Sequence, residues 1–226
     1  MLPACSRIYF TRKETVTRHR IQTTLILALV GGFVVSGVAS NGWARLFNGK
    51  DLSGWRAVGD EKWTAQNGSI VGEAVTEKYG YLVTEKLYSD FILRLKFKCD
   101  APGNYGLFIR SRITGEGKWG PDIQGPQVEI DPSRDTAGIY ESGGREWLSR
   151  PTAESLKTLK PYDWNEMEVE ANGSQIVTRL NGQTMVDFHD PEPRFHEGII
   201  GLQLHSGGGG KIHFKDIEVK ALNSKE

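Results

Sequence analysis

The stretch "WNEMEVEANGSQIVTRLNGQTMVDF", residues 164–188, decides the fold class of this chain. It contains two Asn-Gly pairs, at 172–173 and 181–182, and Asn-Gly is the dipeptide that best suits the tight type I′ turn of a β-hairpin. The runs beside these pairs are short and mix apolar with polar residues, as half-buried strands do. The stretch therefore predicts consecutive antiparallel strands joined by tight turns.

The same pattern of strand and turn continues on both sides of this stretch. In "SDFILRLKFKCD", residues 89–100, apolar residues at every second position from Phe91 to Phe97 alternate largely with basic ones, which predicts a strand with one buried face. Asn67-Gly68 is a further hairpin signal, and the one helical pattern, which starts at Thr152, is short. About a dozen short strands with regular turns predict an all-β fold, a two-sheet antiparallel β-sandwich of the jelly-roll type.

The beginning of the chain has the composition of an export leader. Basic residues from Arg7 to Arg20 precede an uncharged segment from Ile21 to Ser40, which ends in small residues. This order is typical of a signal peptide, and a retained single-span anchor is the alternative, because the segment is nearly long enough to cross a bilayer. We expect an exported protein, periplasmic or extracellular, that touches a membrane only if the leader stays attached. The expected division is a leader at 1–44 with cleavage near Ser40 or Ala44, a domain at 45–221 and a flexible tail at 222–226.

The composition excludes other classes of protein. Hydrophobic residues make up 38% and charged residues 25% of the chain, which suits a packed core rather than disorder. Without the leader the chain keeps 23 basic and 27 acidic residues, and no basic stripe with interleaved aromatics is present, so nucleic acid is not an expected partner. Only Cys99 remains outside the leader. The domain therefore has no internal disulfide, and we expect this thiol to be buried.

Polar residues occupy every second position of several predicted strands. The clearest case is "GPQVEIDPSRDTAGIYE", residues 125–141, which begins with three polar side chains that share one side of an extended segment. The residues placed on one face in this way are Gln127, Glu129 and Asp131, then Gln203 and His205, then Arg110 and Arg112. On neighbouring strands they predict the floor of a sugar-binding cleft. An ordinary solvated strand face is the alternative.

Aromatic and acidic residues nearby add to this hypothesis. Tyr140 and Glu141 are adjacent, so only one of them faces such a cleft if the segment is a strand. Trp119 and Trp147 are expected in loops beside the polar strands. An indole in that position stacks well on a sugar ring, although tryptophan also fills protein cores.

Other chemistries have weaker signals. Glu129, Asp131 and His205 are suitable ligand types for a divalent metal, but no HExxH, CxxC or EF-hand spacing occurs. No GxSxG motif is present, which disfavours a serine hydrolase. Jelly-roll hydrolases with two catalytic carboxylates need the arrangement E-x-D-x-x-E, and Arg134 stands where the second glutamate belongs.

Five segments of the chain resemble, in the same order, segments of the 3-keto-disaccharide hydrolase family. They are "LFNGKDLSGW", "GNYGLFIRSR", "GPQVEID…AGIYE", "DWNEMEVEANGSQIVTRLNGQ" and "GIIGLQLHSGGGGKIHFKDIEV". The resemblance covers nearly all of the chain after the leader. It implies a concanavalin A-like jelly roll, a fold that also serves lectins, and an exported bacterial protein.

The resemblance also implies a reaction. The family cleaves the glycosidic bond of a sugar that carries a ketone at carbon 3. The ketone acidifies the hydrogen on carbon 2, a base removes it, and the leaving group departs from carbon 1. Water then adds back, or the unsaturated sugar is released. Such a site needs a base near neutral pKa, an electrophile beside the enolate and a proton source for the leaving oxygen.

The resemblance implies roles for particular residues. Glu129 or His205 would be base and leaving-group acid, Arg110 would stabilise the enolate, and Glu129, Asp131 and His205 would hold a divalent metal if there is one. The residues expected to hold the sugar are Gln127, Asp131, Tyr140, Glu141, Arg145, Gln203 and Trp119. A non-catalytic carbohydrate-binding domain and a plain interaction module at the cell surface are the alternative functions.

Overall fold

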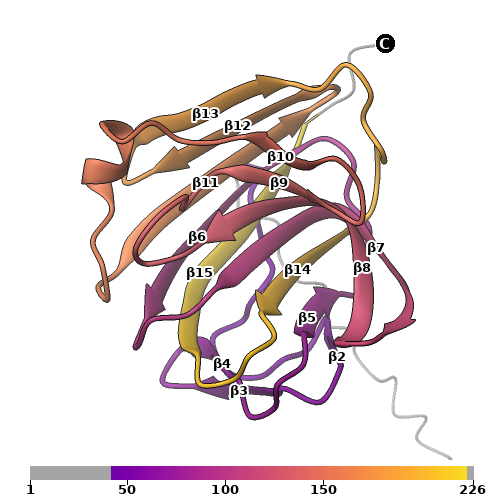
Figure 1. Ribbon diagram of the computed structural model, residues 1–226, viewed down its shortest axis with the longest axis vertical. Helices are drawn as coiled ribbons and strands as arrows, with labels where there is room; N and C mark the ends of the chain where they lie inside the picture. Colours follow the sequence, from indigo (N-terminus) through magenta and orange to yellow (C-terminus); the bar gives the residue numbers. More distant parts are fainter. Residues whose placement is uncertain (1–41, 223–226) are drawn as a thin grey trace, which may run out of the picture. The chain divides into compact units, whose positions relative to one another are not determined.

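The computed structural model describes residues 42–222 and has two antiparallel β-sheets that face each other (Figure 1). Sheet A has the order β13 (Gln183–His189), β12 (Gln175–Leu180), β11 (Asn165–Asn172), β6 (Phe91–Cys99), β15 (Lys211–Ala221), β4 (Ser69–Glu73) and β3 (Lys62–Gln66), with β1 (Ala44–Arg45) beside β15. Sheet B has the order β10 (Glu146–Ser149), β9 (Ile139–Ser142), β8 (Gly120–Ile130), β7 (Tyr105–Gly117), β14 (Ile199–Leu204), β5 (Gly80–Thr84) and β2 (Trp55–Val58). The all-β jelly-roll prediction is confirmed.

The core lies between the two sheets and is built by alternation along the strands. In β6, Phe91, Leu93 and Phe97 are buried in it, while Arg94 on the same strand points to solvent. Each large apolar side chain buried in this way contributes roughly 1.5–3 kcal/mol to folding. Cys99 ends this strand as a buried free thiol, as expected, and burial raises its pKa to about 12.

The Asn-Gly pairs form turns as the sequence predicts. Asn67 and Gly68 have φ angles of 49° and 75°, and Asn181 and Gly182 have 50° and 83°. Positive φ at both central residues is the signature of the type I′ turn. The pair Asn172-Gly173 is placed differently. Asn172 is the last residue of β11, so the two residues between β11 and β12 are Gly173 and Ser174. The predicted helical pattern forms only a short 3-10 turn, η1 (Ser155–Thr158).

The ends of the domain differ slightly from expectation. Ala44 of β1 pairs with Val219 of β15, so the folded part begins before residue 45. Strand β15 ends at Ala221, as expected. The predicted leader lies outside the described residues up to position 41, as does most of the predicted tail. Within residues 42–222 no helix is long and apolar enough to cross a bilayer.

Arg110 is a structural residue, contrary to the prediction that it faces the sugar. A register shift between Phe108 and Arg112 interrupts the alternation of β7, and Arg110 takes a φ of 46°. Its guanidinium donates from Nη2 to Asp90 Oδ1 at 2.6 Å and from Nη1 to the carbonyl of Gly173 at 2.6 Å, with Nε bound to the carbonyl of Ser89. The residue is 2% exposed. It therefore joins sheet B to loops at the end of sheet A and is not available as an enolate stabiliser.

Glu141 and Arg145 form a second structural link, and Glu141 does not point toward the predicted sugar-binding face. On β9, Tyr140 and Glu141 point to opposite faces, and Ile139 on the side of Glu141 belongs to the core. Arg145 donates to Glu141 Oε2 at 2.9 Å and to Asp190 Oδ2 at 2.7 Å. Hydrogen bonds from Arg145 lower the pKa of both carboxyl groups. The triad links the two sheets where their edge strands β10 and β13 lie.

The role of Arg110 predicts a loss of stability when it is replaced. Arg110→Ala should lower the free energy of unfolding by about 3 kcal/mol or more, because it leaves the Asp90 carboxylate and two carbonyl groups without their donor. Urea denaturation measures this, with Arg112→Ala at an exposed position of the same strand as the control. Lost activity with unchanged stability in Arg110→Ala would contradict this assignment.

Candidate functional site

The outer face of sheet B, which points away from the core, carries its own small apolar cluster. Tyr81, Val83, Phe108 and Ile123 pack together there, on β5, β7 and β8. Their strand neighbours Leu82 and Leu107, for example, belong to the main core. Alternation therefore gives sheet B two buried sides, one toward sheet A and one beneath this outer cluster.

A polar cluster continues from this apolar cluster along the same face. Gly106 is paired with Glu129 of β8 on one side and with Gln203 of β14 on the other. Because Gly106 has no side chain, Gln127 Nε2 reaches across β7 and donates to Gln203 Oε1 at 3.1 Å. The same amide nitrogen donates to Glu129 Oε2 at 2.9 Å. The prediction that Gln127 and Glu129 share one face is confirmed.

Glu129 has an environment that holds its proton tightly. It is 5% exposed, and its Oε1 accepts a hydrogen bond from Asn104 Nδ2 at 2.7 Å. Burial, with the nearby charge of Asp131, raises its pKa to about 8, although the Asn104 bond acts in the opposite direction. A carboxyl group with such a pKa is mainly protonated at neutral pH and can exchange a proton with a ligand.

His205 directly follows β14 on the same face and is held by two partners. Its Nδ1 lies 3.0 Å from the carbonyl oxygen of Ser206, and its Nε2 lies 3.2 Å from the hydroxyl of Tyr79. A carbonyl oxygen only accepts, so Nδ1 carries the proton and Nε2 of the neutral ring accepts from Tyr79. The pair therefore sets up proton transfer from Tyr79 to His205.

Tyr79 is fixed by several neighbours. Its ring stacks on Tyr81 with centroids 6.4 Å apart. Its backbone N–H donates to the carbonyl of Trp119, at the tip of the β7–β8 hairpin, at 2.7 Å. The preceding loop is held by Glu61, which accepts from the N–H of Val75 at 2.5 Å. This support keeps the phenol in front of His205.

Tyr140 and Trp147 border the polar cluster on the side of β9 and β10. They are paired across the two strands, and their rings meet edge to face with centroids 5.5 Å apart. Partial burial, followed by the negative charge of Glu146 and of Glu129, raises the pKa of Tyr140. Tyr140 therefore looks onto the same region as Glu129, as predicted, and Trp147 lies in an edge strand rather than a loop.

Several expected site residues are brought together and others are not. The outer face of sheet B unites Gln127, Glu129, Tyr140, Gln203 and His205. Asp131 lies at the end of the same strand and caps a turn there, because its Oδ1 accepts from Ser133. Trp119 is 50% exposed at the hairpin tip, and its backbone rather than its indole contacts Tyr79.

The predicted metal site is not assembled. Across residues 42–222 no three His, Cys, Asp or Glu side chains gather as metal ligands, so the structure does not bring Glu129, Asp131 and His205 together as a ligand set. The reason is local. The carboxylate of Asp131 is turned into the 131–133 turn, and both ring nitrogens of His205 have protein partners.

Sequence reasoning missed Tyr79 and Asn104. Tyr79 lies two residues before Tyr81, so alternation along β5 was a signal for placing both phenols on one face. Asn104 lies in a loop between Gly103 and Tyr105, where no periodicity predicts the direction of a side chain.

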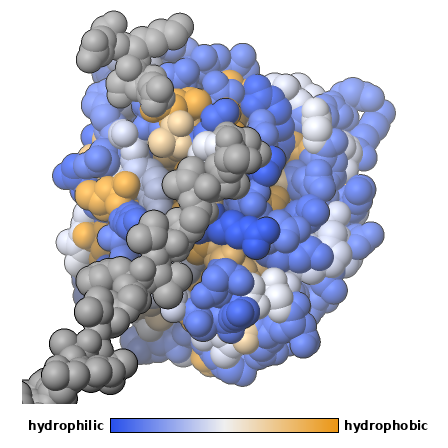
Figure 2. All heavy atoms as spheres, turned by 180° about the vertical axis from the view of Figure 1, so that it is seen from behind, coloured by the Kyte–Doolittle hydropathy of each residue, from blue (hydrophilic) through white to orange (hydrophobic). Residues whose placement is uncertain are grey.

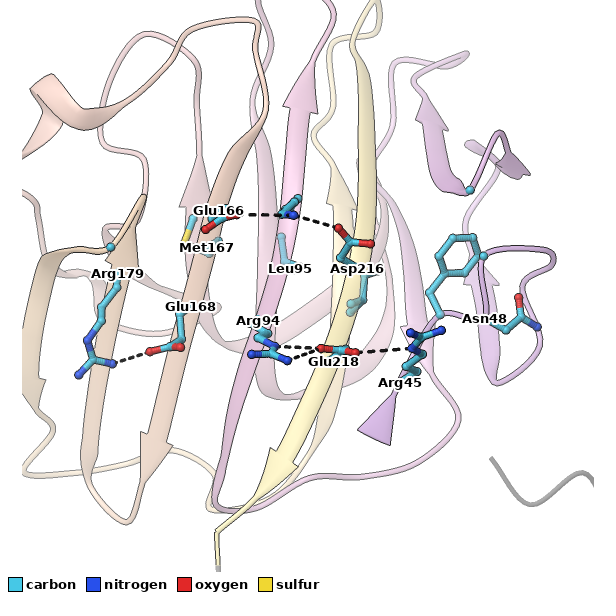
Figure 3. Close-up of a pocket in the computed structure, with 16 residues that line it drawn as sticks. Arg45, Asn48, Arg94, Leu95, Glu166, Met167, Glu168, Arg179, Asp216 and Glu218 are labelled. Carbon is cyan, nitrogen blue, oxygen red and sulfur yellow. Dashed lines mark hydrogen bonds and ion pairs between the residues drawn. The ribbon is translucent and has the colours of Figure 1, made fainter. Parts of the chain in front are cut away.

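A larger hollow, of about 550 Å³, lies on the outer face of sheet A (Figure 3). Ion pairs cross it between neighbouring strands, such as Arg94 with Glu218 and Arg179 with Glu168. Its charged lining residues are four basic and four acidic ones, so the charges balance. Such exposed pairs are typical of a solvated sheet face.

Few large hydrophobic side chains are exposed among residues 42–222. The view in Figure 2 is mostly hydrophilic outside the atoms drawn in grey. Of the described residues, the exposed large hydrophobic ones are Val75, Leu87, Trp119 and Tyr162, which come from separate loops. The outer face of sheet B is therefore the better candidate site, because it combines buried ionisable groups with aromatic side chains.

Known proteins of similar structure include sugar-binding ones. A crystal structure of a candidate glycosyl hydrolase from Parabacteroides distasonis matches with a TM-score of 0.62 and 25% identity, covering 81% of this chain and 95% of that one. A carbohydrate-binding module of Bacillus subtilis matches with a TM-score of 0.58 and 16% identity, covering 74% and 96%. The second likeness concerns the fold alone.

Sequence comparisons identify the family. The chain is 25% identical to the 3-keto-disaccharide hydrolase of Bacteroides thetaiotaomicron in an alignment of 238 positions, which covers 82% of this chain and 80% of that one. A family model, the 3-keto-alpha-glucoside-1,2-lyase-like domain, matches residues 42–220. The chain belongs to the 3-keto-alpha-glucoside-1,2-lyase-like domain family.

Proposed function

We propose that this protein cleaves the glycosidic bond of 3-keto-glycosides or 3-keto-disaccharides, by elimination followed by hydration, on the outer face of sheet B. The observation that carries the proposal is the presence, on one face, of a buried carboxyl group with a pKa of about 8 and of an imidazole that accepts a hydrogen bond from a phenol. An elimination needs one group that accepts a proton and another that donates one. Membership of the family supports the choice of substrate.

The Tyr79–His205 pair acts as the base. Tyr79 Oη takes the proton from carbon 2 of the keto sugar while its own proton passes to His205 Nε2, the acceptor of the existing hydrogen bond. The electron pair of the C2–H bond forms the double bond to carbon 1, and the bond from carbon 1 to the leaving oxygen breaks. The ketone at carbon 3 stabilises the intermediate charge on carbon 2.

Glu129 acts as the acid. It is protonated near neutral pH and gives its proton to the leaving oxygen. In the second step water adds to carbon 1, Glu129 takes a proton from that water, and His205 returns a proton through Tyr79 to carbon 2. The sum of the steps is hydrolysis, and both groups return to their starting state. Gln127 and Gln203 keep the Glu129 carboxyl in place.

The remaining residues of the face bind the sugar. Tyr140 and Trp147 present aromatic surface and a hydroxyl group beside Glu129, which suits the apolar face and the polar edge of a sugar ring. We also propose that the protein acts outside the cytoplasm, because its sequence begins with a basic and then uncharged leader-like segment. The second candidate function is a lectin-like domain that binds sugar on the same face without turnover.

Glu129 as the acid predicts an effect that depends on the leaving group. With 3-keto-trehalose, Glu129→Gln should lower kcat by about 10²–10⁴-fold. With a 4-nitrophenyl 3-keto-α-glucoside, whose leaving group needs no proton, the loss should be less than about tenfold. Wild-type kcat should fall above about pH 8, where Glu129 loses its proton. Glu116→Gln, at an exposed carboxylate of β7, is the matched control. Binding without turnover by the wild-type protein would favour the lectin-like function.

Tyr79 as part of the base predicts a loss of activity that does not depend on the leaving group. Tyr79→Phe removes the hydroxyl that receives the carbon-2 proton, so kcat should fall by about 10²-fold or more with both leaving groups. The melting temperature should change little, because the phenylalanine ring keeps the stacking on Tyr81. Exchange of the carbon-2 hydrogen for solvent deuterium, followed by NMR, should slow in parallel. Unchanged exchange in this variant would rule out Tyr79 as the proton acceptor.

The raised pKa of Glu129 also predicts how stability depends on pH. The unfolded chain loses this proton in the ordinary glutamate range, and the folded chain loses it near pH 8, so folding is favoured by the protonated form. Wild-type stability should therefore fall between about pH 5 and pH 9, relative to Glu129→Gln, by on the order of 5 kcal/mol. Denaturant titrations at a series of pH values measure this difference. Parallel pH curves for the two proteins would contradict the raised pKa.

A further inference from the structure

A small pocket of about 150 Å³ adjoins the two proposed catalytic groups. Asn104 and His205 line it on one side, and the loop from Ser206 to Gly210 lines it on the other. Asn104 is the residue that donates a hydrogen bond to Glu129, and His205 is the partner of Tyr79. The pocket is therefore lined by one neighbour of Glu129 and one neighbour of Tyr79, but not by Glu129 or Tyr79 themselves.

Apart from Ser206, the wall formed by the loop consists of glycine residues. Gly207, Gly208 and Gly209 have φ angles of 108°, 69° and 77°, a region that L side chains rarely adopt. The loop is tied to its surroundings because the N–H of Gly207 donates to the carbonyl of Glu77 at 3.3 Å. A wall without side chains lets a flat polar group lie close to the main chain, as at other sites where glycine allows close approach of a ligand.

Asn104, which also lines the pocket, carries an unpaired acceptor. Asn104 Oδ1 is buried and has no hydrogen-bond partner among the residues that the structure describes. In the structure Nδ2 of the amide faces the Glu129 carboxyl oxygen, which it contacts at 2.7 Å, and Oδ1 lies on the other side of the amide. A buried acceptor without a donor costs free energy, so this position favours a bound group that carries an O–H or N–H.

We propose that the pocket between Asn104 and the Ser206–Gly210 loop is a subsite for one edge of the keto-sugar ring, and that Asn104 Oδ1 accepts a hydrogen bond from one sugar hydroxyl. The inference rests on the proposed function and names the group that recognises the sugar. The pocket volume corresponds to about five water molecules, so it takes one hydroxylated edge of a monosaccharide and not a second sugar unit. Asn104 is then a positioning residue that connects the bound sugar to Glu129.

A double-mutant cycle between ligand and protein tests this. Dissociation constants are measured by calorimetry for methyl 3-keto-α-glucoside and its 2-, 4- and 6-deoxy forms, in the Tyr79→Phe background, which slows turnover and keeps the Glu129 carboxyl beside Asn104. One of the three deoxygenations should weaken binding about five- to tenfold, the effect of one hydrogen bond. The same deoxygenation should have no effect once Asn104→Ala is added, since the acceptor is already gone. Asn172→Ala, at an exposed asparagine of sheet A, should leave the full pattern unchanged.

Each outcome bears on the subsite separately from the reaction. If the wild-type protein cleaves 3-keto-trehalose and all three deoxygenations have the same effect with and without Asn104, Oδ1 binds water only and the subsite is wrong while the function stands. If the wild-type protein shows no turnover but one hydroxyl still depends on Asn104, the subsite stands in a sugar-binding protein. If neither turnover nor binding of any of these sugars is observed, both the subsite and the proposed function are wrong.

Discussion

The site depends on the absence of a side chain at Gly106. This residue lies in the middle of sheet B, paired with Glu129 on one side and Gln203 on the other. A Cβ atom there would lie 2.6 Å from both Gln127 Nε2 and Gln203 Oε1. The two amides would have to separate, and Glu129 would lose the alignment of its partner Gln127. The polar cluster therefore exists because one strand contributes only backbone at its centre.

The two sheets solve the problem of an exposed outer face differently. Sheet A covers its outer face with ion pairs between neighbouring strands, which leave no net charge and are hydrated. Sheet B buries polar groups beside an apolar cluster and aromatic rings, and desolvation raises the pKa of Glu129. Only the second arrangement prepares ionisable groups for proton transfer, and it explains why the larger hollow is not the better site.

Local patterns in the sequence predict most of the fold and part of the site. Alternation places Gln127 with Glu129 and Gln203 with His205, because these pairs lie on or directly after regular strands. It fails for Arg110, where a bulge and a positive φ turn the side chain toward Asp90. It cannot place Asn104, whose position depends on tertiary packing around a loop. The site contains residues from regular strands and from irregular loops. Only the strand residues follow a periodic pattern that can be recognised in the sequence.

The central claim is that the sugar binds on the outer face of sheet B. The most direct test is a crystal structure of the Glu129→Gln protein soaked with 3-keto-trehalose. The account predicts the keto-sugar ring between His205 and Tyr140, with carbon 2 facing Tyr79 and the glycosidic oxygen facing residue 129. A sugar bound instead among the ion pairs of sheet A, beside Arg94 and Glu218, would contradict it.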